Sequence, residues 1–173
     1  MQPTEDFDPI PAGEPPLLPI LNRYRPMGRT GTVDFPTTRP VVVTTKSHIN
    51  LVVQHSDWEG QSATILDRSQ WVQCYARNDH LGLVIPYEYL DSEHTYEPDF
   101  LVRLTNGLQL LLEIKGYEVH NPEQTNAKHG AAKRWIQAVN NLGDFGMWEF
   151  LVVRELDELE SALARLAKEA KTP

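Results

Sequence analysis

The sequence is poor in cysteine and in long apolar runs. Cys74 is its one cysteine, which excludes an internal disulfide and a cysteine-based zinc site and fits a reduced, intracellular compartment. No stretch approaches the roughly 18 consecutive apolar residues of a membrane-spanning helix. The amino-terminal residues also lack the basic and then apolar pattern of a signal sequence. These absences predict a soluble, cytoplasmic protein with no membrane partner.

Positive charge is also scarce. The 173 residues include 16 lysines and arginines against 24 acidic residues, which gives a formal net charge of -8. Such a balance argues against a protein that holds nucleic acid by bulk electrostatic attraction alone. With 40% apolar residues, the chain has the length and composition of one ordinary domain with extensions.

Proline divides the chain into two parts. Residues 1–40 hold nine of the thirteen prolines, so neither a helix nor a sheet ladder can run through them. We therefore expect residues 1–40 to form a proline-rich arm or linker and residues 41–173 to form the folded domain. One function consistent with this division is an adaptor whose arm recruits partners.

Hydrophobic patterns in the second part predict an α/β protein. Apolar runs and turn residues predict strands, while a 3.6-residue period and a capping sequence predict helices. The expected strands are residues 41–45, 49–53, 71–76, 81–89, 100–104, 108–115 and 147–153, with a turn at 77–80. The expected helices are residues 56–69, 123–142 and 155–170.

Two charged residues stand out in the apolar run "LQLLLEIK", residues 108–115. Glu113 and Lys115 point to one face of the expected strand, while Leu112 and Ile114 point to the other. A strand that is apolar on most of both faces is typical of the centre of a covered sheet. A glutamate there is costly unless it is paired or binds a metal ion.

The preceding strand offers a second acid at the same place. If residues 105–107 form a three-residue hairpin loop, Phe100 faces Leu112 and Asp99 falls opposite Glu113. A two-residue loop would instead place Asp99 opposite Ile114, with its side chain averted. Only the first register puts both carboxylates on one face, with their roots about 5 Å apart. A divalent cation such as Mg²⁺ would relieve the repulsion between them.

These residues resemble a known nuclease signature. Pro98 and Asp99 are followed, after thirteen residues, by Glu-Ile-Lys at 113–115, which resembles the PD-(D/E)xK motif. The segments "HTYEPDFLVRL", "LLLEIKGYE", "AAKRWIQAVN" and "FGMWEFLV" resemble the endonuclease domain at the carboxyl end of type III restriction enzyme subunits and related helicase-linked restriction proteins. The resemblance covers about residues 38–153.

The resemblance implies a restriction-endonuclease-like fold, with a mixed central sheet flanked by helices, and a Mg²⁺-dependent DNA endonuclease of the defence type. Mn²⁺ is an alternative ion. Asp99 and Glu113 would hold the metal, with the backbone carbonyl of Ile114 as a further ligand. Lys115 would position the attacking water or offset negative charge on the phosphate. The alternative for Lys115 is a purely structural ion pair with Glu113 or Asp99.

Two further residues have two interpretations each. Glu59, three residues after Ser56, fits a capping box. It also lies on the helix stripe that must face the core, where nucleases of this fold often carry another catalytic, metal-binding acid. Lys128 lies in the apolar arc of its helix. It would either extend to water or contact a DNA phosphate. The histidines form no H-x-x-x-H pair and are interpreted as ordinary polar residues.

The resembling proteins carry an ATP-dependent motor, but this sequence has neither a G-x-x-x-x-G-K-[ST] loop nor a DEAD-type box. A helicase, translocase or specificity subunit on another chain is therefore an expected partner, unless the motor was excised. Self-association into a homodimer is the other way to complete the machinery. The alternative function is a catalytically silent nuclease-fold module for DNA binding or complex assembly.

Overall fold

The computed structural model describes residues 16–19, 30–115 and 121–169. Its helices are a short 3-10 helix, Thr30–Thr32, and three α-helices: α1 (Asp57–Arg68), α2 (Pro122–Leu142) and α3 (Leu156–Lys168). Its strands are β1 (Val41–Val43), β2 (Leu51–Val53), β3 (Val72–Arg77), β4 (Ile85–Tyr89), β5 (Ser92–Tyr96), β6 (Phe100–Leu104), β7 (Gln109–Ile114) and β8 (Trp148–Val153).

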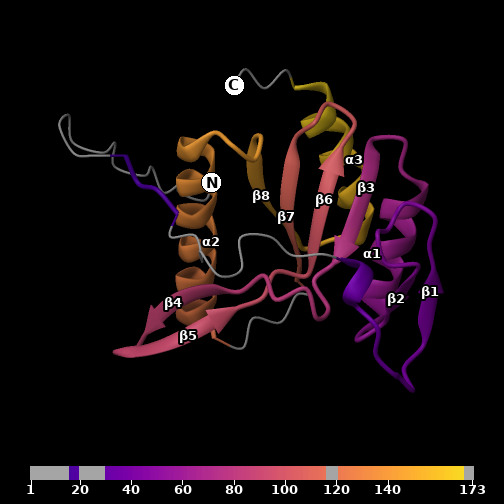
Figure 1. Cartoon of the computed structure of the whole chain (residues 1–173), viewed down its shortest axis with the longest axis horizontal. Helices are drawn as coiled ribbons and strands as arrows, with labels where there is room; N and C mark the ends of the chain where they lie inside the picture. Colours follow the sequence, from indigo (N-terminus) through magenta and orange to yellow (C-terminus); the bar gives the residue numbers. More distant parts are fainter. Residues whose placement is uncertain (1–15, 20–29, 116–120, 170–173) are drawn as a thin grey trace.

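Four strands form a central mixed sheet in the order β3-β6-β7-β8 (Figure 1). β3, β6 and β7 are antiparallel neighbours, whereas β8 runs parallel to β7 after the crossover through α2. Two separate hairpins, β1-β2 and β4-β5, flank this sheet. The protein is therefore a mixed α/β structure, as the hydrophobic patterns predict.

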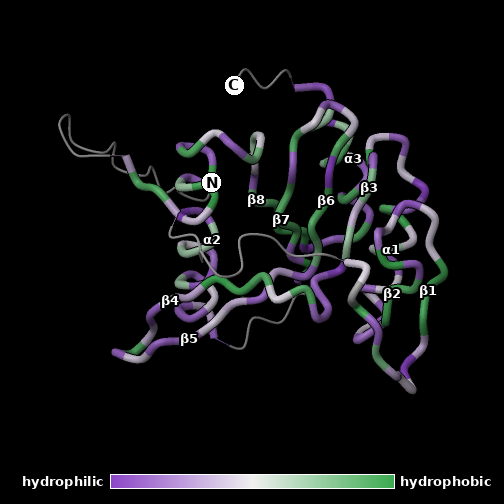
Figure 2. Tube along the Cα trace, in the orientation of Figure 1, coloured by the Kyte–Doolittle hydropathy of each residue, from purple (hydrophilic) through white to green (hydrophobic). Residues whose placement is uncertain are grey.

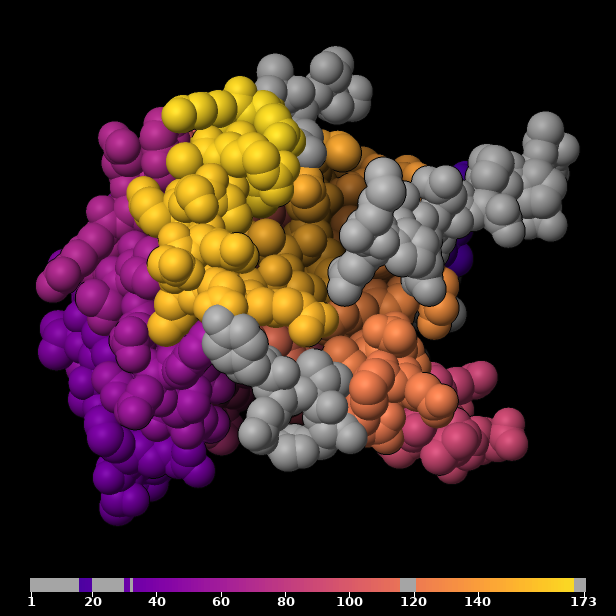
Figure 3. All heavy atoms as spheres, turned by 180° about the vertical axis from the view of Figure 1, so that it is seen from behind, coloured from indigo at the N-terminus to yellow at the C-terminus, as the bar shows by residue number. Residues whose placement is uncertain are grey.

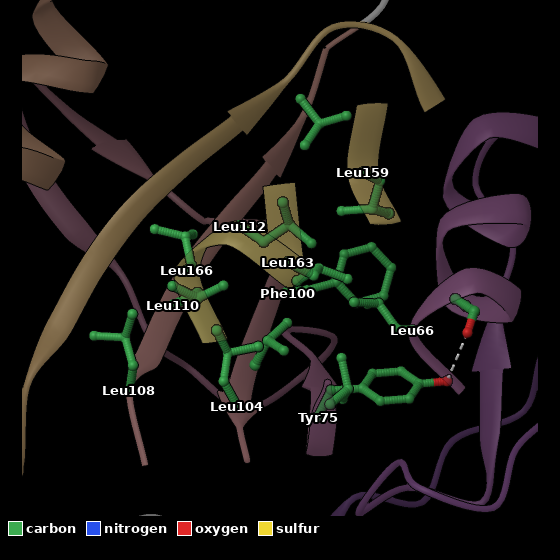
Figure 4. Packing of buried hydrophobic residues seen from close by; sticks show 14 of the residues in the cluster. Leu66, Tyr75, Phe100, Leu104, Leu108, Leu110, Leu112, Leu159, Leu163 and Leu166 are labelled. Atoms are coloured by element: carbon green, nitrogen blue, oxygen red, sulfur yellow. Dashed lines mark hydrogen bonds between the residues drawn. The ribbon is translucent and has the colours of Figure 1, made fainter. Parts of the chain in front are cut away.

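Helices cover both faces of the central sheet. On one face, α1 and α3 pack against leucines and aromatics of β3, β6 and β7 (Figure 4). Tyr75 in this layer donates its hydroxyl hydrogen to the Ala63 carbonyl at 3.1 Å, drawn as the dashed line. Seen from behind, α3 lies beside α1 over this face (Figure 3). On the other face, α2 and the β4-β5 hairpin pack over Leu111.

α1 and α2 begin at residues whose side chains satisfy one of their first backbone N–H groups, whereas α3 has no such side-chain cap. The Ser56 hydroxyl accepts a hydrogen bond from the backbone N–H of Glu59 at the start of α1. The Asn121 side chain does the same for Gln124 at the start of α2, directly before a proline at the first helical position. α2 ends at Gly143, whose φ of 77° suits a left-handed cap. The expected helices are thus correct to within a few residues.

The β6-β7 register matches the three-residue loop. Phe100 pairs with Leu112, and Val102 pairs with Leu110. The Leu104 N–H donates to the Leu108 carbonyl at 2.8 Å, closing the loop over residues 105–107. Within it, Gly107 has a φ of 87°, a conformation that side chains with a Cβ rarely adopt. This register places Asp99 opposite Glu113.

Three local expectations were wrong. β5 was not predicted, because its sequence "SEHTY" is polar and largely exposed, as the hydrophilic colouring of this strand shows (Figure 2). It is specified instead by its pairing with β4. Arg77 was expected in a turn, but it is the last residue of β3 and is only 6% exposed. β4 begins at Ile85 rather than at residue 81.

Most of the proline-rich arm, residues 1–15 and 20–29, lies outside the described residues. Of the described part, the Leu17 carbonyl accepts a hydrogen bond from the Asn141 side chain of α2 at 2.9 Å. Within residues 16–19, 30–115 and 121–169, no helix has the length and apolar character needed to cross a membrane.

Candidate active site

Asp99 and Glu113 lie next to each other at one end of the central sheet. Asp99 directly precedes β6, and its Oδ2 atom accepts a 2.7 Å hydrogen bond from the backbone N–H of Ile114. Glu113 is the fifth residue of β7 and is 6% exposed. Because the bond to Ile114 ties Asp99 to β7, both carboxylates are fixed on the same side of the sheet.

Tyr96 and Lys115 hold the Glu113 carboxylate. The buried Tyr96 hydroxyl donates to Oε2 of Glu113 at 2.6 Å, and the Lys115 ammonium lies 3.3 Å from Oε1. Tyr96 comes from the end of β5, the strand that the sequence did not predict. The glutamate therefore has a donor or cation at each oxygen, as a buried carboxylate requires.

The two acids repel each other in a site that water scarcely reaches. Burial, and then the negative charge of Glu113, raise the pKa of Asp99 to about 7. Glu59 adds to this rise, while the Ile114 N–H and the charge of Arg77 oppose it. Burial, followed by the charge and hydrogen bond of Glu113, also raises the pKa of Tyr96, which stays protonated as a donor. A cation placed between the acids would remove this repulsion.

Glu59 points inward from α1, as expected, but its carboxylate forms an ion pair with Arg77. The Arg77 guanidinium lies 2.5 Å from Oε2 of Glu59 and 2.7 Å from Oδ2 of Asp79. The same Glu59 oxygen accepts from the backbone N–H of His55, the residue before the cap. Burial would lower the pKa of Arg77, but its two carboxylate partners outweigh burial and raise it. Glu59 is thus a capping and ion-paired residue beside the two acids.

The donor set suits a hard divalent cation only in part. Asp99 and Glu113 supply carboxylate oxygens on one face, which Mg²⁺ prefers. The Ile114 carbonyl points toward the Asp99 side, because the N–H of the same residue bonds to Asp99 while the next N–H, of Lys115, bonds to Val153 on the other side. Within the residues that the structure describes, no three or more histidine, cysteine or acidic side chains gather closely enough to bind a metal.

Lys128 lies in the first half of α2. It lines a groove between α2 and the β4-β5 hairpin, together with Gln124, Tyr87 and His94. Its side chain is half-buried there. The structure therefore brings Asp99, Glu113 and Lys115 together, places Glu59 near them in an ion pair, and leaves Lys128 at the rim.

Sequence reasoning missed Tyr96, Arg77 and Asp79. Each reaches the site from a strand end or turn, and none belongs to the Pro-Asp and Glu-Ile-Lys segments. The signal for Tyr96 was its position three residues before Asp99, on the strand that leads into β6. Arg77 directly follows the apolar run "WVQCYA", so it lies at the end of a buried strand. An arginine in such a position is a candidate partner for a buried carboxylate.

No protein-family model, curated protein or solved structure matches this chain. The likeness to the restriction nucleases therefore rests on the sequence segments quoted above.

Proposed function

We propose that the protein is a Mg²⁺-dependent DNA endonuclease domain of the restriction type, with a restriction-endonuclease-like fold. The observation that carries this proposal is the pairing of two carboxylates, the buried Glu113 and the partly buried Asp99, with Lys115 at the end of neighbouring strands. A chain that kept these acids together for stability alone would place a cation between them. Here no such cation lies between them, and burial, followed by the remaining repulsion from Glu113, raises the pKa of Asp99.

Each residue has a definite task in this proposal. Asp99 and Glu113, with the Ile114 carbonyl, hold Mg²⁺, or Mn²⁺ in its place. The ion supplies charge neutralisation at the scissile phosphate and an activated water. Lys115 orients that water or stabilises the charge that develops on the phosphate. Glu59 is a further candidate ligand, which must loosen its contact with Arg77 to take part. Lys128 contacts the DNA backbone at the rim.

Partners follow from the same proposal. The substrate is DNA, and a motor or specificity subunit, or a second copy of the chain, brings it to the site. A nuclease of this type acts in the cytoplasm.

A cleavage assay tests the proposal. Asp99→Ala and Glu113→Ala should each abolish Mg²⁺-dependent cutting of duplex DNA while the chain still folds, since neither acid contributes to the apolar core. Asp144→Ala, an exposed residue between α2 and β8, is the matched control and should cut normally. Unchanged cleavage in Asp99→Ala or Glu113→Ala would refute the assignment of that residue to the catalytic metal site.

A catalytically silent module for DNA binding or assembly is the alternative. The observation that favours it is the set of existing ion pairs, because Lys115 is already paired with Glu113 and Arg77 with Glu59. Calorimetric titration of Mg²⁺ and Mn²⁺ into the wild-type chain separates the two functions. Metal binding that is lost in Asp99→Ala supports the nuclease, whereas no binding and no cleavage support the silent module.

A further inference from the structure

The end of the sheet that carries the acids also carries a row of cations. The Lys115 N–H donates to the Val153 carbonyl at 2.9 Å, and Ile114 pairs with Val153 in the parallel β7-β8 ladder. One step further along both strands, Lys115 lies beside Arg154. Two positive residues, Lys115 and Arg154, therefore follow the ends of β7 and β8. Arg154 lies on the side of β7 that is opposite Asp99.

Both cations act electrostatically on α2. Lys115 pairs with Glu113, which shares the face of Leu111, and the charges of Lys115 and Arg154 both act on His129 of α2. Leu111 and Phe150 are paired in register and pack in the layer under α2. Both cations thus lie near α2. They follow the end of the sheet near which α2 begins (Figure 1).

α2 adds His129 to this place. The His129 ring packs edge-on against Phe150, with 5.2 Å between ring centroids, and its Nε2 atom is buried with no hydrogen-bond partner. Burial, followed by the charges of Lys115, Arg154, Lys133 and Lys128, lowers the pKa of His129 to about 4. The imidazole is therefore neutral at pH 7 and lies at the base of a positively charged surface.

This arrangement is unfavourable without an anion. Like charges side by side on neighbouring strands destabilise a sheet, and the chain has an excess of acidic residues from which a partner could come. Nevertheless, no described carboxylate forms an ion pair with the exposed Arg154. Lys115 is shared between Glu113 and this surface. The acidic pair, Asp99 and Glu113, and the cationic pair, Lys115 and Arg154, thus lie side by side at one end of the central sheet.

We propose that Lys115 and Arg154, with His129 at the base, form a phosphate-binding site beside the two carboxylates. Its ligand is a phosphodiester of the nucleic-acid backbone next to the one that is cut, so this assignment rests on the proposed nuclease function. The guanidinium of Arg154 binds phosphate oxygens through two hydrogen bonds. Lys115 contacts both Glu113 and the bound anion, so the anion lies directly beside the two acids.

Binding of inorganic phosphate by the full chain, without metal, tests the site apart from catalysis. Sodium phosphate is titrated against sodium chloride at equal ionic strength while the ring signals of His129 are followed by NMR. Phosphate, but not chloride, should shift these signals and raise the pKa of His129 by about one unit, because an anion offsets its cationic surroundings. Absence of a phosphate-specific shift would overturn the site.

Arg154→Gln should weaken phosphate binding roughly tenfold or more, since a charge-assisted hydrogen bond is lost. Arg103→Gln is the matched control, because it removes the same charge from an exposed position at the far end of β6. Equal effects of the two variants would show that only net charge matters and would refute the site. Arg154 is exposed, so the variant should fold, which a thermal melt checks.

A cleavage series separates this inference from the function on which it rests. If the chain cuts DNA, Arg154→Gln should raise KM more than it lowers kcat, and it should reduce the slope of log affinity against log salt by about one. Cleavage without any response to Arg154→Gln would overturn the phosphate site and leave the nuclease. Phosphate binding without cleavage in any condition would leave an anion site but overturn its assignment to the substrate backbone.

Discussion

Asp99 is the residue whose chemistry depends most on its surroundings. It is held by one backbone N–H, while Glu113 and Glu59 repel its negative charge. The folded state therefore favours the protonated form of Asp99. Its pKa rises from an ordinary value of 3.8 to about 7.

This shift makes stability depend on pH in a defined direction. Between about pH 4 and pH 7 the unfolded chain gives up the Asp99 proton while the folded chain keeps it, so stability falls as pH rises through this window. Asp99→Asn removes the titration and keeps an oxygen acceptor for the Ile114 N–H. At pH 8 without divalent metal, the variant should be more stable than wild type by a few kcal/mol, at about 1.4 kcal/mol per pKa unit.

Thermal melts at pH 4 and pH 8 measure this difference. The gain in Tm should be large at pH 8 and small at pH 4, where the folded wild type keeps the Asp99 proton and the unfolded chain has lost only about half of it. Asp144→Asn removes the same charge from an exposed loop and should change Tm little at either pH. A gain for Asp99→Asn that is equal at both pH values would contradict the repulsion between the acids.

Tyr96 is the donor that makes a buried Glu113 tolerable. Tyr96→Phe keeps the ring in its apolar layer and removes only the hydroxyl, leaving one Glu113 oxygen without its donor. We expect a loss of about 1.5–3 kcal/mol in the free energy of unfolding at pH 7, the usual range for a hydrogen bond to a charged group. Denaturant titration measures it.

Tyr89→Phe is the control for this prediction, because its hydroxyl bonds to Asn121 at an exposed position. It should cost much less than Tyr96→Phe. Equal losses in the two variants would mean that the Tyr96 hydroxyl does not support Glu113.

At the scale of elements, Arg77 joins β3 to α1 and to the turn that follows β3. Its guanidinium contacts Glu59 and Asp79 and lies 5.8 Å from the centre of the Phe100 ring. The Arg77 and Glu59 side chains are only 8% and 17% exposed, so solvent screens their ion pair weakly. The ion pair between Arg77 and Glu59 thus holds α1 against the sheet directly beside the two acids.

A double-mutant cycle measures the coupling free energy between Arg77 and Glu59. Arg77→Met should cost about 3–5 kcal/mol, because it leaves two partly buried carboxylates without their cation. Adding Glu59→Gln should recover at least about 1 kcal/mol of that loss. Arg165→Met, in an exposed pair with Glu169, should cost less than about 1 kcal/mol. Strictly additive losses for Arg77→Met and Glu59→Gln would exclude a coupled pair.

The elements show which parts of the structure local sequence can specify. The β6-β7 register was predictable, because a three-residue loop and alternating side chains leave one arrangement in which Asp99 and Glu113 share a face. α1 was predictable from its capping sequence, and α2 and α3 were predictable from their apolar stripes. β5 was not, because a polar strand is stabilised by its partner and not by its own composition.

The site was predictable only where its residues share one hairpin. Asp99, Glu113 and Lys115 follow from β6 and β7, but Tyr96, Arg77 and His129 arrive from β5, β3 and α2. No periodicity within a segment reveals which distant side chain will complete a buried polar group. The same limit explains why a histidine outside any metal-binding pattern was interpreted as an ordinary polar residue.

At the scale of the whole molecule, negative charge dominates. The net charge is -8, and the acids near the sheet edge repel phosphate until a cation neutralises them. In the proposed function, Lys115, Arg154 and Lys128 would supply a few phosphate contacts, whereas tight binding of duplex DNA normally needs several more. We therefore predict that the chain alone lacks submicromolar affinity for duplex DNA at physiological salt.

Titration of labelled duplex into the isolated chain, with Ca²⁺ in place of Mg²⁺ to block cutting, measures this affinity, and sedimentation shows whether the chain is monomeric. Tight binding by a monomer would contradict the prediction and would show that the chain captures DNA unaided. Tight binding that appears only with self-association would mean that a second copy supplies the missing contacts and sets one site on each strand. Weak binding by both forms leaves capture to a motor or specificity subunit, because cleavage by a site that repels its substrate requires another surface to hold the DNA against it.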